Sequence, residues 1–394
     1  MKYRAITLLL LVVIATGTGY AKKPKGLVSF QFYGSQWSVR VSEQLHFAEP
    51  GTTSFAVFDT LSIERHIKDT FDDCIALKAR RRLNDWAYMK MLDSLSVASF
   101  GTGNEATLMK TYLMAKSGYD IILLRDKNIL HIGYYSKYTV YRKSYITTDG
   151  KNYYLDVDKA GTYKVLSFRC KGKPVSFELK VQPLLDRKNS QKRIFETSKE
   201  FCTRHHETPL SIEVSVNQNL MDFYAQYPNA EKNYDFTTRW ALMANVPLDD
   251  DVKKQIYPSL RKQLEGLSQY DAVNKLLHFV QTSRDWAYDD DVWGHDRAFF
   301  AEETLFYPSN DSEDRVILLS RLIRDLLDME VVILFFPGHL SMAVRFDEDI
   351  EGACVIYNSD RFVICDPSYI GSDIGEPFPQ FADQDPERMI LLYR

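Results

Sequence analysis

The clearest pattern of apolar and polar positions lies in the last third of the chain. A polar stretch, residues 309–315, leads into the apolar run Val316 to Leu327, which has the composition and length of a helix. Two strand-like runs follow; Gly338-His339 opens the first, and Cys365-Asp366-Pro367 closes the second. This order predicts a helix packed on an antiparallel sheet.

The first half of the chain alternates between strand-like and helix-like patterns. Short strands are predicted at residues 27–33, 37–41 and 56–61, with a Gly34-Ser35 turn after the first. Helices are expected over residues 62–117. Further strands are then predicted at residues 119–124, 129–135, 138–146 and 153–155, with a hairpin turn at Asp149-Gly150.

The order of these elements occurs twice. A helix, a strand, a strand with His131, a hairpin and then Asp156 parallel the later series that contains His339 and Asp366. Two interpretations stay open, a degenerate copy of the same unit at about residues 60–160 or a coincidence between two α+β segments. In such a copy Asn104 falls near the position of Ser312, so the copy would be inactive.

The middle of the chain is predicted to be rich in strands, at residues 163–168 and 175–181. Helical segments follow, one interrupted at Pro258 and one starting at Ser268 with Asp271 as its capping-box partner. The fold class is therefore α+β. The predicted divisions are a signal peptide at 1–21, an N-terminal β segment at 22–60, an α+β domain at 61–160, a β-rich module and connector at 161–245, and a C-terminal domain at 246–394.

Candidate chemistry lies in the C-terminal domain. Ser312 stands at the helix start, and His339 and Asp366 follow at intervals of 27 residues. Helix start, then His, then Asp is the chain order of a papain-like thiol triad. Its first member is a Cys at a helix N-terminus, where the dipole and the His favour the thiolate. In this chain a hydroxyl stands in that position.

The residues around these three positions carry a more specific pattern. They are Phe299 to Pro308 (FFAEETLFYP), Asp311 to Arg315 (DSEDR), Pro337-Gly338-His339, and Cys365 to Gly371 (CDPSYIG). In order and spacing they resemble the transglutaminase-like superfamily, specifically a group of secreted bacterial proteins that carry this domain. The resemblance covers roughly Pro209 to Arg394, and it implies a papain-like fold with Ser312, His339 and Asp366 at the triad positions.

The chain departs from the family pattern in two places. Ser312 replaces the Cys of the family's Asp-Cys-Glu-Asp-Arg segment, and Val292 stands where relatives tend to have a Gln. A Ser hydroxyl is far less acidic than a thiol and needs a well-placed general base and oxyanion hole. The replacement therefore predicts that cysteine-type transglutaminase or protease activity is absent and that the triad positions are vestigial.

Each of the three residues also has a structural explanation. Asp311 or Ser312 could simply cap the helix, with Asp314 favoured in its first turn. His339 could be a hydrogen-bonded structural residue, and Asp366 could form an Asx turn before Pro367.

Three functions are consistent with these features. The first is a binding module without chemistry, with a peptide or a cell-envelope glycan in the former cleft. The second is a hydrolase or acyltransferase that uses a Ser312-His339-Asp366 triad. The third is a structural or assembly protein of the cell envelope.

The first 21 residues have the features of a signal peptide. Lys2 and Arg4 precede an apolar region, Ala5 to Ala15, and Gly19-x-Ala21 is a small-residue cleavage site. Cleavage after Ala21 would give an exported protein, periplasmic or extracellular, without a membrane span. Loss of Lys2 and Arg4 takes the formal net charge from −4 to −6, which excludes an overall basic surface for nucleic acid. The sequence gives no indication of the oligomeric state.

Other residues invite weaker interpretations. A two-residue turn at Ser359-Asp360 would place Cys354 opposite Cys365, either as a disulfide or as two small buried residues. Cys202, His205, His206 and Glu207 lack a second ligand pair, so neither a metal nor a cofactor is predicted. Several aromatic and imidazole side chains surround Asp289-Asp290-Asp291, and they could line a groove or close the core: Trp286, Tyr288, Trp293, His295 and Phe299.

Overall fold

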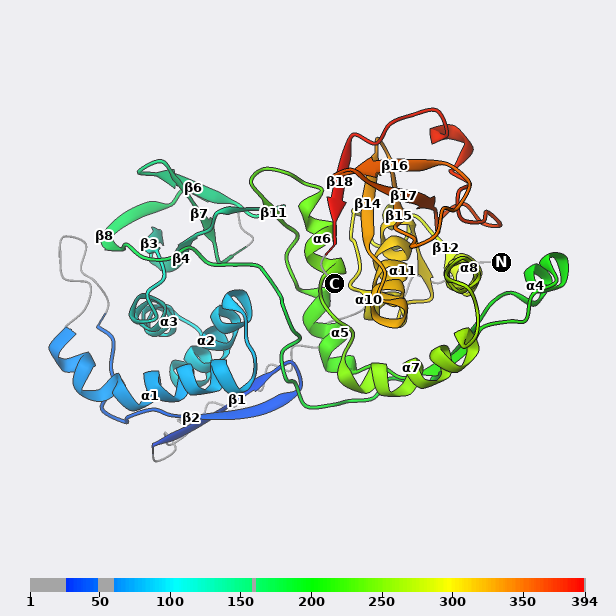
Figure 1. Ribbon diagram of the computed structural model, residues 1–394. Helices are drawn as coiled ribbons and strands as arrows, with labels where there is room; N and C mark the ends of the chain where they lie inside the picture. Colours follow the sequence, from blue (N-terminus) through cyan, green and yellow to red (C-terminus); the bar gives the residue numbers. More distant parts are fainter. Residues whose placement is uncertain (1–25, 49–59, 158–160, 393–394) are drawn as a thin grey trace.

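The computed structural model describes residues 26–48, 60–157 and 161–392. The predicted signal peptide lies outside these ranges, as do parts of the predicted N-terminal β segment. Helices and strands are mixed along the chain, which confirms the α+β class. In Figure 1 two lobes lie side by side, one blue to teal and one yellow to red, and each contains a five-stranded sheet.

The first lobe begins with a hairpin and three helices. The elements are β1 (Leu27–Phe32), β2 (Ser35–Arg40), α1 (Thr60–Arg80), α2 (Asp85–Phe100) and α3 (Asn104–Lys116). Every second residue of β1 and β2 is buried, as the alternating sequence predicts. The turn falls at Tyr33-Gly34 rather than Gly34-Ser35, because Phe32 pairs with Ser35.

The sheet of the first lobe is antiparallel, in the order β6-β7-β4-β3-β8. Its strands are β3 (Ile121–Asp126), β4 (Ile129–Tyr135), β6 (Tyr145–Thr148), β7 (Lys151–Leu155) and β8 (Lys164–Cys170). The single strand predicted over 138–146 is wrong, since Arg142 has a φ of 58° and divides the segment. Its first part, β5 (Tyr138–Val140), pairs instead with β11 (Ala230–Lys232).

The strands of the segment between the lobes lie at other residues than predicted. Residues 175–181 form no ladder, although Val175, Phe177 and Leu179 are buried. Side chains supply hydrogen bonds to part of this backbone: the Tyr227 hydroxyl donates to the Phe177 carbonyl, and the Asn84 amide donates to the Glu178 carbonyl. The elements here are β9 (Arg193–Glu196), α4 (Lys199–His205), β10 (Ser211–Val214), α5 (Gln218–Ala225) and α6 (Thr238–Ala244).

Two longer helices lead into the second lobe. The helix α7 (Asp250–Leu264) continues through Pro258, contrary to the predicted interruption; Pro258 lies on its exposed face. The helix α8 (Gln269–Thr282) begins as predicted, since Ser268 accepts a hydrogen bond from the Asp271 N–H. Short elements follow: β12 (Asp285–Trp286), α9 (Asp289–Val292), α10 (Ala301–Thr304) and β13 (Ser309–Asn310).

The second sheet packs against the helix α11 (Ser312–Leu327). Its strands are β14 (Val331–Phe336), β15 (His339–Val344), β16 (Cys354–Tyr357), β17 (Asp360–Cys365) and β18 (Arg388–Leu391), and a short 3-10 turn, η1 (Pro379–Phe381), precedes the last strand. The order β16-β17-β15-β14-β18 matches that of the first sheet strand for strand. A duplicated unit requires this match, and the duplication itself stays a prediction.

The two units use their corresponding polar residues differently. Asn104, the first residue of α3, bonds the backbone of Asn128 and Leu130 at the start of β4. Asp156 accepts hydrogen bonds from Lys110 and from the Ile132 N–H, whereas His131 packs against Tyr163. His131 and Asp156 therefore form no pair like the one predicted for the second unit.

The hairpin formed by β16 and β17 corrects the predicted cysteine register. Its turn is Asn358-Ser359, both with positive φ, so Cys354 lies opposite Val363 rather than Cys365. All five cysteines are free thiols. None of the helices in the described ranges combines the length and apolar character that crossing a bilayer requires.

The cysteine register can be tested by alkylation of the native protein. We expect iodoacetamide to modify Cys354, which is exposed, and to spare Cys365, which is fully buried with a thiol pKa raised by burial. Mass spectrometry of native and unfolded samples would measure both. A peptide pair linked through Cys354 and Cys365 would contradict this register.

Candidate functional site

The helix α11 begins in a network of buried acidic groups. Asp311 is the N-cap residue, and its N–H donates to Asp314 Oδ2 at 3.3 Å. Asp314 Oδ1 accepts a second hydrogen bond from the Phe299 N–H at 2.8 Å. Burial, and after it the nearby Glu313, raises the pKa of Asp314 well above its usual range. Asp311 thus holds the capping position that the sequence allowed for Asp311 or Ser312, and Ser312 is the first residue of the helix.

Arg315 connects this helix start to the neighbouring segments. Its guanidinium is fully buried and donates to Asn310 Oδ1 at 2.7 Å, the Arg284 carbonyl at 3.3 Å and the Pro367 carbonyl at 3.5 Å. Burial lowers its pKa to about 10, against the effect of the nearby carboxylates. Arg315 therefore fixes the helix that carries Ser312 against the loop that carries Asp366.

His339 and Asp366 form the predicted pair. His339 opens β15, Asp366 directly follows β17, and these strands are neighbours, so Nε2 of His339 lies 2.7 Å from Oδ2 of Asp366. The imidazole also stacks on the Phe381 ring, with centroids 4.9 Å apart and an interplanar angle of 3°. Asp366 Oδ1 accepts from the Ser368 N–H, so the residue forms the expected Asx turn as well.

Ser312 and His339 line one cavity of about 440 Å³, together with Glu313, Trp240 and Phe335. The Ser312 hydroxyl donates to Glu313 Oε2 at 3.0 Å. Within the described ranges, no hydrogen bond joins Ser312 to His339. The structure therefore brings the three predicted site residues to one place, but the hydroxyl is bonded to a carboxylate rather than to the imidazole.

Gln281 is a site residue that the sequence did not reveal. It lies on α8, fully buried, and its amide nitrogen contacts the carbonyl oxygens of Asp366, Tyr369 and Ser372 at 2.9–3.2 Å. Its Oε1 accepts from the Gly371 N–H at 3.0 Å. The only sequence signal is a long polar residue directly after the apolar residues of an amphipathic helix. Gln281 fixes the loop after Asp366 and so orients the partner of His339.

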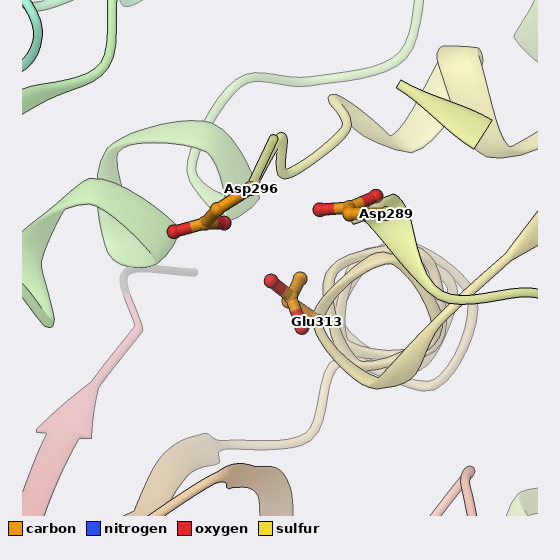
Figure 2. A group of neighbouring side chains, drawn as sticks. All are labelled: Asp289, Asp296 and Glu313. Carbon is orange, nitrogen blue, oxygen red and sulfur yellow. The ribbon is translucent and has the colours of Figure 1, made fainter. Parts of the chain in front are cut away.

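A group of three carboxylates borders the Ser312 cavity (Figure 2). Asp289, Asp296 and Glu313 each place one oxygen within 4.8 Å of the others. Burial is the largest cause that raises the pKa of Asp289 to about 6. The sequence drew attention to the Asp289-Asp290-Asp291 run and to the Asp311 to Arg315 segment that contains Glu313. It did not indicate Asp296, nor that these three carboxylates lie together.

The aromatic residues around that run serve different purposes. Phe299 is buried and packs with Trp293 and Tyr307 around the Arg297 guanidinium, which closes the core. Trp286 and Tyr288 are exposed, and neither lines the Ser312 cavity. His295 lines a neighbouring cavity of about 450 Å³ that shares Tyr141 and Asp296 with the first.

The four residues considered as metal ligands do not converge. Glu207 Oε1 lies 2.8 Å from His278 Nδ1, and the His205 ring stacks on Phe201. In the described part of the chain, the acidic trio is the one group of three or more such side chains with ligand-like spacing.

Comparisons with known proteins give no further assignment. Family models, curated proteins and solved structures each return no match to this chain.

The hydrogen bonds of Gln281 predict a clear effect on stability. Gln281→Leu keeps the side chain similar in size but removes the donor to the Asp366 and Ser372 carbonyls and the acceptor of the Gly371 N–H, which costs about 2 kcal/mol or more. The Tyr369 carbonyl still accepts from Ser372. Urea unfolding measures this loss. The control Gln384→Leu changes an exposed glutamine near the C-terminus and should leave the free energy of unfolding almost unchanged. Equal stability of both variants would contradict the role of Gln281.

The raised pKa of Glu302, which lies on α10, predicts that the stability of the protein depends on pH. Burial raises its pKa from 4.5 to about 8, although the Asp249 N–H donates to it. The folded protein therefore holds this proton more tightly than the unfolded chain does. The contribution of the protonated Glu302 to the free energy of unfolding is complete below about pH 4.5. It is lost as the pH rises through 8, at up to about 1.4 kcal/mol per pH unit.

The variant Glu302→Gln cannot titrate, so its stability should rise relative to wild type between pH 5 and pH 8. Urea unfolding at both pH values measures the difference, and the exposed substitution Glu43→Gln is the control. A difference between wild type and Glu302→Gln that stays constant with pH would show that Glu302 is ionised in the folded protein.

Proposed function

We propose that this is an exported transglutaminase-like binding protein that holds a ligand chain beside Ser312 without chemistry. The observation that carries the proposal is the hydrogen bond from the Ser312 hydroxyl to Glu313, in a cavity where the His339-Asp366 pair is complete. The papain-like fold is part of the proposal. It is supported by the helix-then-sheet order and by the resemblance of the residues around the three positions.

The chemistry of a hydroxyl favours binding over catalysis here. A Ser nucleophile needs its proton directed at a general base, and the Ser312 proton is directed at Glu313. The nitrogen of His339 that contacts Asp366 is Nε2, so Nδ1 is the ring atom that remains for a nucleophile or ligand. Without a hydrogen bond from Ser312, this nitrogen is available to a bound group.

The lining of the cavity favours a peptide over a glycan. Its volume of about 440 Å³ is within the usual range of ligand sites. Trp240 and Phe335 stack on each other, with centroids 5.6 Å apart, and Phe236 meets Phe335 edge to face. A sugar would need an open aromatic face on the largest ring, whereas Trp240 is buried, stacks on Phe335 and has the Arg239 guanidinium over its ring at 4.7 Å. Apolar walls with a few polar groups suit the side chains of a polypeptide segment.

One observation favours a hydrolase or acyltransferase as the second candidate. The His339-Asp366 pair has the geometry that orients an imidazole as a general base, and it lies in the same cavity as a hydroxyl. Rotation of the Ser312 side chain away from Glu313 would be the first requirement for this activity.

Ser312→Cys tests the site directly. A thiol at this position should react faster with iodoacetamide than a free cysteine does, because His339 can stabilise the thiolate. The double variant Ser312→Cys, His339→Ala should lose this enhancement. Equal rates in both variants would separate His339 from the Ser312 site and overturn the triad geometry.

Wild-type protein should not turn over p-nitrophenyl acetate above the Ser312→Ala background. Turnover that Ser312→Ala abolishes would make the protein a serine enzyme.

For binding, peptides selected from a random phage library on wild type should lose affinity for Ser312→Phe, in which the cavity is filled. They should keep their affinity for Ser38→Phe, a substitution on the exposed face of β2. Selected peptides that bind Ser312→Phe as well as wild type would overturn the proposed ligand site.

A further inference from the structure

A second cavity, of about 450 Å³, lies beside the Ser312 cavity at the border of the two lobes. Both lobes line it: Tyr141 to Lys143 follow β5 in the first lobe, and His295 to Ala298 precede α10 in the second. Tyr141 and Asp296 line both cavities, so the two are neighbours. A peptide that fills the Ser312 cavity can therefore continue into the second one.

The second cavity has an excess of positive charge. The residues that line it and carry a permanent charge at neutral pH are Arg142, Lys143, Asp296 and Arg297. Asp296 is paired with Arg239 at 2.6 Å, and Arg297 is paired with Glu303. Arg142 is exposed, and within the described ranges its guanidinium makes no ion pair or hydrogen bond. Its charge is therefore available to a ligand in this cavity.

The Ser312 cavity has the opposite excess. Glu231, Asp296 and Glu313 line it, and Arg239 neutralises only Asp296. In the part of the chain that the structure describes, neither Glu231 nor Glu313 forms an ion pair. An acidic side chain would be repelled from the Ser312 cavity and attracted to its neighbour, so charge determines which cavity it enters.

Arg142 occupies a backbone position that favours glycine. The Lys143 N–H donates to the Val140 carbonyl at 3.4 Å, and Arg142 between them has a φ of 58°. These are features of a type II turn, whose third residue is usually Gly, because a positive φ strains a residue that has a Cβ atom. The turn would form more readily with glycine, so the fold alone does not account for an arginine without a partner.

The turn that carries Arg142 is fixed by pairing between distant segments. Val140 pairs with Ala230 of β11, and the Tyr141 N–H donates to the Asn229 carbonyl at 2.9 Å. The backbone beside the cavity is therefore ordered before a ligand arrives. A preorganised site loses less conformational entropy when it binds.

We infer that the second cavity holds an acidic side chain of the bound peptide, with Arg142 as its partner. The inference rests on the proposed function and adds a charge requirement to it: the ligand carries Asp or Glu beside the segment that fills the Ser312 cavity. A guanidinium binds a carboxylate through two parallel hydrogen bonds, so the contact fixes the position of the peptide as well as attracting it.

A C-terminal carboxylate has the same charge, but the surroundings favour an internal residue. Gln226 lines the second cavity and also two cavities of the first lobe, of about 580 and 240 Å³. The three cavities meet at this side chain, so a peptide has room to continue beyond Arg142. The ligand group is therefore the side chain of Asp or Glu within the peptide.

Peptides selected from a random phage library on the wild-type protein test the inference. Those that use the Ser312 cavity are recognised by their loss of affinity for Ser312→Phe, and they should share an Asp or Glu at one position. Synthetic copies with amidated C-termini should still bind in a fluorescence anisotropy assay. Replacement of the shared Asp by Asn, or Glu by Gln, should weaken binding roughly tenfold or more, as expected for loss of a charged hydrogen bond.

Three variants of the protein separate charge from folding. Arg142→Glu should weaken binding of the acidic peptide to a similar extent and should favour a peptide with Lys at the shared position. Arg142→Gly should lose affinity without a lower melting temperature, since glycine fits the turn. Arg82→Glu is the matched control and should bind as wild type does, because Arg82 is also exposed, has a φ of 55° and lines neither cavity.

The outcomes distinguish this inference from the proposed function. Peptides that need the Ser312 cavity but share no acidic position, or that bind Arg142→Gly as tightly as wild type, would overturn the inference and leave the binding function in place. Peptides that lose affinity on amidation would assign the cavity to a C-terminal carboxylate and overturn the internal side chain. If Ser312→Phe weakens no selected peptide, the proposed function fails and the inference fails with it.

Discussion

The arrangement of the second lobe depends on the buried guanidinium of Arg315. It joins Asn310, Arg284 and Pro367, which belong to three segments distant in the sequence. A fully buried cation is costly unless its donors are satisfied, and here backbone carbonyls and an amide oxygen satisfy them. The start of α11 and the end of β17 cannot separate without the loss of these bonds. Ser312 and Asp366 are therefore placed by a residue that does not line the cavity.

Those parts of the site that follow from chain order were predictable from the sequence. His339 opens one strand and Asp366 follows another, and antiparallel pairing of β15 with β17 brings them together. The helix start at Ser312 follows from the polar-to-apolar change after residue 315. The prediction failed where register or long-range contact decides, as for the Cys354 hairpin, where a one-residue error in the turn changes the partner.

Contacts between residues that are far apart in the sequence produce no sequence pattern from which they could be predicted. Gln281 looks like an ordinary polar position of an amphipathic helix, and only the fold shows that it bonds the loop after Asp366. Glu313 is one of several acidic residues near the helix start, and its bond to Ser312 depends on side-chain direction. Residues 175–181 alternate like a strand, yet their backbone is satisfied by side chains such as Tyr227 and Asn84. Secondary-structure propensity indicates the local conformation of a segment, whereas tertiary contacts determine which residues its backbone and side chains bond.

The first lobe has the same strand order with a different arrangement of polar residues. Lys110 is buried between Asp93 and Asp156, at 2.9 and 3.2 Å, and Asn104 bonds the backbone at the start of β4. These polar groups bond one another and the backbone, although Asp93 and Asp156 also line cavities of about 580 and 240 Å³. In the second lobe, Ser312 and His339 each keep a side facing the cavity.

The stacking of His339 on Phe381 also restricts the direction of approach to the imidazole. One face of the ring is covered at 4.9 Å, and one edge is taken by Asp366. A flat aromatic group cannot insert between the two rings, so the reachable nitrogen meets partners only along its own plane. The site should therefore discriminate by the angle of a hydrogen bond, and compounds that bind by ring stacking should be poor competitors.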